Sequence, residues 1–148
     1  MNVFYLPDAQ LGNISFPEEE SKHIVKVLRM REGDNFCVTN GKGSIFDAEL
    51  IDAHPKRAVA NLSNQRQGYD NRSFKLSIAI APTKLNERTE WFLEKATEIG
   101  IDEIKLFASY HSERRIANVE RFRKIVIAAM KQSVKSNMPV IEEMQSFD

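Results

Sequence analysis

The residues of this sequence that are best suited to chemistry are arginines and lysines gathered in two short stretches. Between Ser21 and Arg31 there are four basic side chains and no acidic one, and between His111 and Met138 there are seven basic side chains and two acidic ones. They are Lys22, Lys26, Arg29 and Arg31 in the first stretch, and Arg114, Arg115, Arg121, Arg123, Lys124, Lys131 and Lys135 in the second. Clustered guanidinium and ammonium groups bind phosphates, so both stretches predict an anionic partner, and nucleic acid above all.

A plainer interpretation stays open for each stretch taken alone, because charged side chains on the solvent faces of helices are the ordinary case. The first stretch also follows three glutamates, Glu18 to Glu20, which is the order that a helix dipole favours. Net charge does not decide between an anion-binding surface and ordinary solvated helices, since the 148 residues hold 21 basic and 21 acidic side chains. Residues 1–70 hold 8 basic and 10 acidic side chains, and residues 71–148 hold 13 and 11. The prediction of an anionic partner therefore depends on the clustering of basic side chains in the two stretches.

Other kinds of site are not indicated. None of the three histidines has a second metal ligand three or four positions further on, so no metal site is predicted. Cys37 is the only cysteine, which excludes an internal disulfide, and its apolar neighbours indicate a structural thiol in a strand. No secretory signal and no apolar run near the roughly 20 residues of a membrane span occur, so we expect a cytoplasmic protein.

The elements that must position the first basic stretch are short strands and turns. Strands are predicted over Val3–Leu6, Asn35–Thr39, Phe46–Leu50 and Ala58–Leu62, the last two because apolar and polar residues alternate. Asn40–Gly43, with two glycines, predicts a hairpin turn. Several antiparallel strands and one helix predict a small β-barrel over residues 1–70, because closure removes exposed edges.

The stretch HIVKVLRMREGD, from His23 to Asp34, supplies that helix and the turn after it. Its apolar stripe, expected to face the core, consists of Ile24, Val27 and Leu28. Lys26 and Arg29 would then face water, and His23 is expected to be a hydrogen-bonded structural residue.

Residues 73–148 have a different pattern, and the polar segment Gln65–Ser73 is expected to be the boundary. Leu76–Ala81 is a continuous apolar run, which predicts a strand covered on both faces. A helix should follow it and end at Gly100, in the position of a C-cap. The stripe expected for this helix is Leu85, Arg88, Phe92, Ala96 and Ile99.

A second strand, a second helix and a third strand are predicted after Gly100. The strands are Ile104–Ala108 and Val140–Ile141, and Asn118 has the side chain of a good N-cap for the helix between them. The stripe of that helix is Val119, Phe122, Val126, Ala129, Met130 and Ser133. Strands alternating with helices predict right-handed βαβ units and a parallel sheet.

The order of several short motifs resembles a known family. The motifs are His23, Val27-Leu28-Arg29, Gly33-Asp34, Phe46-Asp47-Ala48, Arg88-x-Glu90, Lys95-Ala96-Thr97-Glu98-Ile99-Gly100, Ser112-Glu113-Arg114 and Ala128-Ala129-Met130-Lys131-Gln132-Ser133 before Pro139. Together they resemble the bacterial small-subunit ribosomal RNA uridine-N3 methyltransferase family of the SPOUT superfamily. The resemblance covers essentially the whole chain.

This resemblance implies a PUA-like, RNA-binding β-barrel over residues 1–70, followed over residues 73–148 by the first part of a SPOUT-type parallel α/β sheet. It implies a homodimer, S-adenosyl-L-methionine as cofactor and small-subunit ribosomal RNA as substrate. In the family, the glycine-rich loops that form the knot and hold the cofactor come after the part matched here. Accordingly, Gly100 is the only glycine beyond Gly68. We expect no cofactor site within this chain, apart from a weak candidate in Gln132.

The resemblance also gives the basic residues their expected roles. The RNA-binding candidates are Lys26, Arg29, Arg31, Arg88, Arg114 and Arg115. Arg114 and Lys135 are the catalytic candidates, as cations that could stabilise a uracil anion. The chain departs from the family pattern at Lys131, Val134 and Lys135, where the family often has an acidic residue, a glycine and an arginine. Lys135 still offers a charge to a phosphate, but a lysine cannot make the bidentate contact of an arginine.

Two other functions are compatible with the sequence. A non-catalytic RNA-binding or ribosome-assembly protein would bind RNA without methyl transfer. A small-molecule α/β enzyme whose basic helices are merely solvated would bind RNA weakly and without regard to Lys26, Arg29, Arg114 and Arg115.

Overall fold

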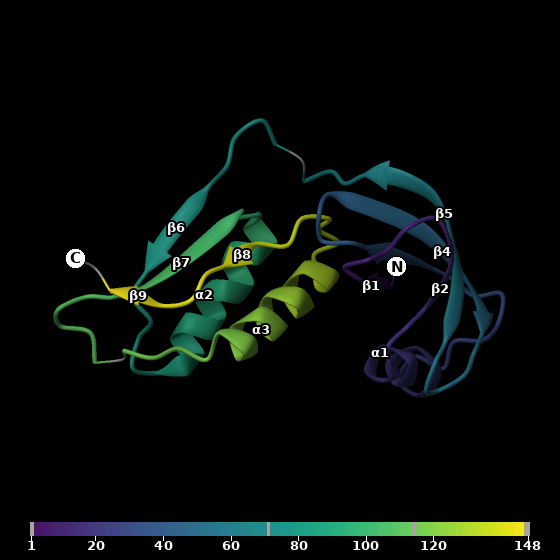
Figure 1. Ribbon diagram of the computed structural model, residues 1–148, viewed down its shortest axis with the longest axis horizontal. Coiled ribbons are helices and arrows are strands. Elements are labelled where there is room, and N and C mark those ends of the chain that lie inside the picture. The colour runs from purple at the N-terminus through teal and green to yellow at the C-terminus, as the bar shows by residue number, and fades with distance from the viewer. Residues whose placement is uncertain (1, 71, 114, 147–148) are drawn as a thin grey trace. The chain divides into compact units, whose positions relative to one another are not determined.

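The computed structural model describes residues 2–70, 72–113 and 115–146 (Figure 1). The chain divides into two compact units, Met1–Tyr69 and Asp70–Asp148, which we call the first and the second unit. None of the helices in the described ranges has the length and apolar character that crossing a bilayer requires.

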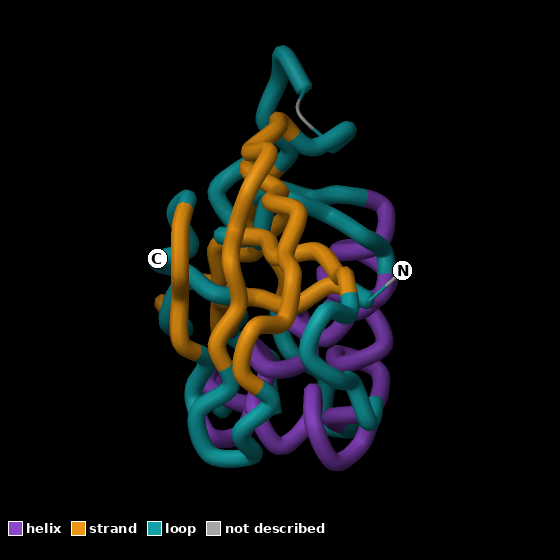
Figure 2. The backbone as a smooth tube through the Cα atoms, turned by 90° about the vertical axis from the view of Figure 1, so that its right-hand side faces the viewer, coloured by secondary structure: helices purple, strands orange, loops and turns teal. Residues whose placement is uncertain are grey.

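The first unit is built on a five-stranded sheet, whose strands are orange in Figure 2. The strands are β1 (Val3–Tyr5), β2 (Gly12–Ser15), β3 (Asn35–Thr39), β4 (Ser44–Asp52) and β5 (Val59–Gln67). They pair in the order β1-β3-β4-β5-β2, and only the β1–β3 pair is parallel. No β1–β2 pairing is found among the described residues, so a closed barrel stays a prediction. β5 also extends to Gln67 and so includes the first three residues of the segment Gln65–Ser73 that was expected to be the boundary.

The predicted hairpin is confirmed between β3 and β4. The Asn40 side chain accepts hydrogen bonds from the backbone N–H groups of Lys42 (2.8 Å) and Ser44 (3.2 Å). Gly41 and Gly43 have positive φ angles of 69° and 94°, which glycine adopts without steric cost. The turn thus follows from its two glycines and one asparagine, and it sets the β3–β4 register.

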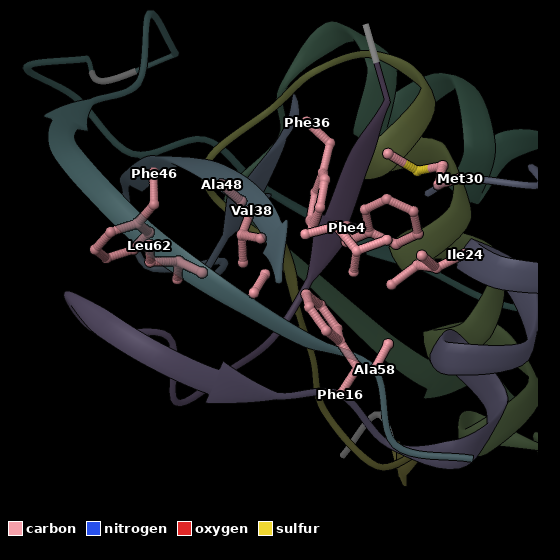
Figure 3. Packing of buried hydrophobic residues seen from close by; sticks show 12 residues of the cluster. Phe4, Phe16, Ile24, Met30, Phe36, Val38, Phe46, Ala48, Ala58 and Leu62 are labelled. Carbon is pink, nitrogen blue, oxygen red and sulfur yellow. The ribbon is translucent and has the colours of Figure 1, made fainter. Parts of the chain in front are cut away.

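Alternating residues of β4 and β5 face the core of the first unit, as predicted. Phe46, Ala48 and Leu50 are buried, while Glu49 between them is exposed. The centre of the core is aromatic, and Figure 3 shows Phe4, Phe16 and Phe36 in contact. The Phe4 ring lies 5.9 Å from the Phe16 ring and 5.1 Å from the Phe36 ring, both in edge-on geometry. These rings join β1, β3 and the segment that leads into the first helix.

The predicted stripe of the first helix is wrong at two of its three positions. Ile24 is fully buried, but Val27 is 69% exposed and Leu28 is 37% exposed. The reason is a change of helix type: α1 (Glu18–Lys22) continues as a π-helix, η1 (His23–Val27), in which the Leu28 N–H bonds to the His23 carbonyl at 2.9 Å. The wider turn rotates the later residues away from the face that an α-helix would bury. His23 is exposed, and its ring contacts Phe4 edge-on at 6.0 Å.

The second unit contains the predicted parallel sheet and its two crossover helices. In chain order the elements are β6 (Ser77–Ile80), α2 (Asn86–Ile99), β7 (Glu103–Ala108), α3 (Val119–Gln132), β8 (Val140–Ile141) and β9 (Gln145–Ser146). The strand order is β6-β7-β8, β9 also pairs with β7, and every pair is parallel.

The helix ends of the second unit follow the predicted signals. The Asn118 side chain accepts a hydrogen bond from the Arg121 N–H at 3.0 Å and so caps α3, whose predicted stripe from Val119 to Met130 is buried. Gly100 ends α2 with φ of 103°, in the left-handed conformation of a C-cap.

The stripe predicted for α2 is right at Ala96, which is buried, and at Phe92, which packs partly buried against the core, but it is wrong at Leu85, Arg88 and Ile99. Leu85 is 57% exposed and Ile99 is 73% exposed. The buried face consists of Thr89, Leu93, Ala96 and Thr97. Two threonines can be buried because their hydroxyls are satisfied: Thr97 donates to the Leu93 carbonyl at 2.7 Å, and Thr89 accepts from the Thr83 N–H at 3.1 Å. Residue polarity alone therefore missed the two buried threonines and misplaced part of the buried face.

β6 is not covered on both faces as predicted. Ser77 and Ala79 are exposed, and Leu76 just before the strand is 38% exposed. Successive right-handed crossovers that advance in one direction place their helices on one face of the sheet. Figure 1 accordingly shows α2 and α3 side by side against the sheet, and the residues of α2, α3 and β7 share one core. The described residues leave the opposite face of β6 open.

Candidate nucleic-acid interface

Three cations at the end of the first helix form what we call the helix-end surface: Lys26, Arg29 and Arg31. All three are exposed, and within the described residues none of them forms an ion pair. Lys22 differs, because it pairs with Glu18 at 2.7 Å one helical turn away, and this hydrogen bond lowers the pKa of Glu18. The surface therefore offers three exposed cations that form no ion pair within the described residues, next to the exposed Val27 and Leu28.

Arg29 holds a backbone conformation that arginine rarely adopts. Its φ angle is 55°, in the left-handed region where helix ends usually have glycine or asparagine. The chain needs this conformation because the Met30 N–H bonds back to the Ile24 carbonyl at 3.0 Å, after which Asp34 accepts the Arg31 N–H at 2.8 Å. A left-handed conformation costs an L-residue about 1–2 kcal/mol. A strained arginine at an exposed helix end supports a role for its side chain.

Cys37 is structural, as predicted, and belongs to a polar cluster of the first unit. Its buried sulfur lies 3.6 Å from the Arg66 guanidinium, which in turn pairs with Asp47 at 2.5 Å. Hydrogen bonds from Asn64 and Arg66 lower the pKa of Asp47. The cluster links β3, β4 and β5 and leaves no charge unpaired, so it indicates structure rather than binding.

Part of the second basic stretch is neutralised by ion pairs. Arg121 of α3 lies 2.6 Å from Glu90 of α2, and Arg123 lies 2.6 Å from Glu120. Of the predicted RNA-binding residues in this unit, Arg88 and Arg115 are exposed and form no ion pair within the described part of the chain. Arg114, predicted to bind RNA and to assist catalysis, lies outside the described residues.

Arg115 lies in the loop that follows β7, at the carboxyl edge of the parallel sheet. A hollow of about 410 Å³ is lined there by Lys84, Glu113, Arg115 and Ile116. Lys84 comes from the loop after β6 and pairs with Glu113 at 3.1 Å. The carboxyl edge is where open α/β sheets bind ligands.

Arg88 occupies a separate place on α2. It lines a hollow of about 430 Å³ together with Glu87, Trp91 and Phe92. Trp91 is 64% exposed although its type is usually well buried. One cation and one carboxylate flank this hollow, so its charge does not select an anion.

Lys135 and Gln132 lie at the opposite edge of the sheet from Arg115. α3 begins after the carboxyl edge and runs back for 14 residues before it reaches Gln132. At 1.5 Å per residue this is a separation of about 20 Å. The Lys135 ammonium instead lies near Gly100, which precedes β7. Within this unit, the structure therefore does not bring Lys135 together with the loop after β7.

Val134 is one of the departures from the family pattern, and its backbone conformation is unusual for a valine. It follows the end of α3 and has φ of 55°, a conformation that suits the glycine often found there in the family and that is a rare outlier for a β-branched residue. We expect Val134→Gly to raise the free energy of unfolding of the second unit by about 1–2 kcal/mol, because the left-handed conformation no longer clashes with Cβ.

Urea unfolding followed by the fluorescence of Trp91, the only tryptophan, measures this change in the second unit. Ala128→Gly, at an exposed position of α3 where the backbone is helical, should instead lower stability by about 1 kcal/mol. A loss of stability in Val134→Gly would show that the valine side chain contributes more through packing than its backbone costs.

Asp70, at the start of the second unit, accepts a set of hydrogen bonds that the sequence did not indicate. The donors are the backbone N–H groups of Ser136 (3.0 Å) and Asn137 (2.8 Å) and the side chains of both residues. Burial by itself would raise the pKa of Asp70, but the hydrogen bonds from Ser136 and Asn137 outweigh burial and lower it. We call this arrangement the Asp70 clamp; it joins Asp70 to the segment between α3 and β8.

Two family models match the chain. A model described as an RNA methyltransferase PUA domain matches residues 16–63, and one described as an RNA methyltransferase domain matches residues 70–148. Among curated relatives, the ribosomal RNA small subunit methyltransferase E proteins of Buchnera aphidicola and Bacillus subtilis are both 27% identical. These matches cover 95% and 90% of this chain, and 58% and 54% of the relatives. The chain thus spans about half the length of the curated relatives it matches.

Solved structures give the same result. A probable rRNA methyltransferase from Porphyromonas gingivalis is 42% identical with a TM-score of 0.90, over 99% of this chain and 61% of that one. A ribosomal RNA small subunit methyltransferase E from Neisseria gonorrhoeae, bound to S-adenosyl methionine, is 27% identical with a TM-score of 0.87, over 99% of this chain and 62% of that one. With one family model covering more than half of the residues and a second covering most of the first unit, the chain belongs to the RNA methyltransferase domain family and carries that family's PUA domain in front.

Proposed function

We propose that this protein acts in S-adenosyl-L-methionine-dependent methylation of uridine N3 in small-subunit ribosomal RNA. The chain would supply the PUA-like RNA-binding barrel (residues 1–70) and the front of the SPOUT-type catalytic domain (residues 73–148). The observation that carries the proposal is the helix-end surface: three exposed cations without ion-pair partners in a unit that matches an RNA methyltransferase PUA domain. Similarity to proteins named ribosomal RNA small subunit methyltransferase E gives the substrate class.

The chemistry of the target explains why RNA must be held firmly. Uracil N3 carries the proton that pairs with adenine, so the target base must be unpaired or turned out of its stack before it can react. Phosphate contacts from Lys26, Arg29 and Arg31 would fix the position of the RNA without reading its sequence. N3 must also lose its proton, and a nearby cation favours the resulting anion. Arg114 and Lys135 remain the candidates for that cation.

The residues of this chain do not by themselves fit the cofactor. Nucleotide-like groups are usually held by glycine-rich loops whose backbone approaches the ligand closely. Gly100 is the only glycine after Gly68, and it ends α2 rather than forming such a loop. Gln132 is exposed and lies at the edge of the sheet away from Arg115. The part played by this chain is therefore to bind and orient RNA, in a cytoplasmic enzyme that we propose to be a homodimer.

The proposal predicts a specific effect of Arg29 on RNA binding. Arg29→Ala should weaken binding of a single-stranded RNA oligonucleotide and reduce the slope of log K against log salt by about 0.7–0.9, the value for one phosphate contact. Arg29→Gly should bind RNA as weakly as Arg29→Ala but be more stable, since glycine relieves the strained backbone. Fluorescence anisotropy over a range of salt concentrations measures both effects on binding.

The matched control is Lys42→Ala. Lys42 lies in the hairpin at the other end of β3 and should leave the salt slope unchanged. If the slope of log K against log salt is the same in the wild type, Arg29→Ala and Arg29→Gly, then Arg29 contacts no phosphate and is an ordinary solvated residue. No measurable RNA binding by the wild type would refute the proposal itself.

A second candidate is an RNA-binding or ribosome-assembly protein that transfers no methyl group. The observation in its favour is the departure at Lys131, Val134 and Lys135 from the residues that the family often has there. Small-subunit ribosomal RNA incubated with S-adenosyl-L-methionine and the full gene product, then digested to nucleosides, separates the two. The methyltransferase proposal expects 3-methyluridine, and RNA binding without it would favour the second candidate.

A further inference from the structure

The loop after β7, described over residues 109–113 and 115–118, presents an aromatic residue that the proposed function has not used. Tyr110 is 88% exposed. Hydrogen bonds close the turn that carries it: the Ser109 N–H donates to the Ser112 hydroxyl at 2.9 Å, and the Ser112 N–H donates to the Ser109 carbonyl at 3.0 Å. The ring therefore extends from a closed turn at the carboxyl edge of the sheet.

Two neighbours brace Tyr110 without covering it. The His111 ring packs edge-on against it, with ring centres 5.0 Å apart and planes at 90°. The Arg115 guanidinium donates to the Tyr110 carbonyl at 3.5 Å, so it lies on the same turn. Edge-on packing by one neighbour, with the side chain 88% exposed, leaves at least one flat face of the tyrosine ring free for another aromatic group.

The surroundings of the ring are suited to an anion with a flat apolar part. Lys84, Arg115 and Glu113 line the hollow of about 410 Å³, and Lys84 pairs with Glu113, which leaves one net positive charge among the lining residues that the structure describes. Ile116, also lining the hollow, is 84% exposed and adds apolar surface. An unpaired nucleotide has both features, because its base has a flat face for stacking and its phosphate is an anion.

We propose that Tyr110 stacks on an unpaired base of bound RNA, while Arg115 contacts a phosphate beside it. The proposal rests on the proposed function, because it assumes that the second unit meets single-stranded RNA. It adds a base contact on the second unit to the phosphate contacts of the helix-end surface. A stacking contact does not depend on released counterions, whereas a phosphate contact does, so the two can be told apart by salt.

The test compares Tyr110→Ala, Tyr110→Phe and Arg115→Ala in binding to a labelled single-stranded RNA oligonucleotide. Tyr110→Ala should weaken binding about tenfold, the typical effect of losing one base–aromatic stack, and leave the salt slope unchanged. Tyr110→Phe keeps the ring and should bind like the wild type. Arg115→Ala should weaken binding and reduce the slope by about 0.7, the value for one phosphate on a single strand. Phe74→Ala is the matched control, since Phe74 is 61% exposed in the second unit but precedes β6, at the edge of the sheet opposite to Tyr110.

The outcomes separate this inference from the proposed function. If the wild type binds RNA and the affinity of Tyr110→Ala is within twofold of it, the stacking contact is overturned and the proposed function still stands. No RNA binding by the wild type would overturn both. An equal loss in Tyr110→Ala and Tyr110→Phe would show that the hydroxyl rather than the ring is recognised, which also contradicts stacking. An oligonucleotide with abasic sites should bind the wild type and Tyr110→Ala equally well.

Discussion

Phe4→Ala is expected to lower the free energy of unfolding of the first unit by about 3–5 kcal/mol, the usual range for removing a fully buried phenylalanine. Phe4 is 1% exposed, and its ring lies edge-on to Phe16 and Phe36, which Figure 3 shows. It also lies edge-on to the His23 ring. Alanine would leave a cavity where β1, β3 and the first helix meet. Rigid strands surround the cavity, so little of its volume can be recovered by relaxation.

Urea unfolding followed by circular dichroism measures this loss, and the fluorescence of Trp91, which lies in the second unit, shows whether that unit is affected. Leu11→Ala is the control in the same unit: Leu11 is 59% exposed, so the change should stay within about 0.5 kcal/mol. If Phe4→Ala does not fold, Phe4→Leu should still show a loss of more than 1 kcal/mol. A loss below 1 kcal/mol in Phe4→Ala would contradict the assignment of Phe4 to the centre of the core.

The same core shows which parts of the fold can be predicted from the sequence. Alternation identified the buried positions of β4, and the Asn118 cap and the stripe after it identified α3, because one periodic pattern coincides with one buried face. The pattern failed where burial depends on something other than polarity. Val27 is exposed because a π-helix changes the rotation per residue, and Thr89 is buried because its hydroxyl has partners.

The candidate site was predictable in its chemistry but not in its geometry. The clusters of lysine and arginine indicated two basic regions, but ion pairs formed in the folded chain decide which charges remain available. Glu90, which precedes Arg121 by a full β-strand and two loops, neutralises it at 2.6 Å. No local pattern reveals such a pair. Tyr110 and the Asp70 clamp were missed for the same reason, since exposure of a ring and convergence of donors on a carboxylate are properties of the folded chain.

Asp70→Asn is expected to destabilise the second unit by about 2–3 kcal/mol at neutral pH, the range for losing hydrogen bonds to a charged acceptor. The carboxylate of Asp70 accepts from two backbone N–H groups and from the Ser136 hydroxyl and the Asn137 amide. The asparagine amide has one oxygen where the carboxylate has two, and its NH₂ group would face donors. At least one N–H of Ser136 or Asn137 would then lose its partner.

The pH dependence of this effect follows from the direction of the pKa shift. The hydrogen bonds in the folded chain lower the pKa of Asp70 below its ordinary value of 3.8. A carboxyl group whose pKa is lowered by folding contributes stability above its unfolded-state pKa and loses it as the pH falls through the folded-state pKa. The wild type should therefore exceed Asp70→Asn in stability by a constant amount above about pH 5, and the difference should shrink steadily below pH 4.

Urea unfolding monitored by Trp91 fluorescence at a series of pH values tests both the size and the direction of the effect. Glu143→Gln is the control, because Glu143 is an exposed carboxylate of the same unit for which no hydrogen bond is found in the described residues. It should cost less than 0.5 kcal/mol at any pH. A stability difference for Asp70→Asn that grows as the pH falls would mean that Asp70 is stabilised in its protonated form. The clamp would then be a neutral hydrogen-bond network, and the segment between α3 and β8 that carries Lys135 would not depend on a charge to hold its position.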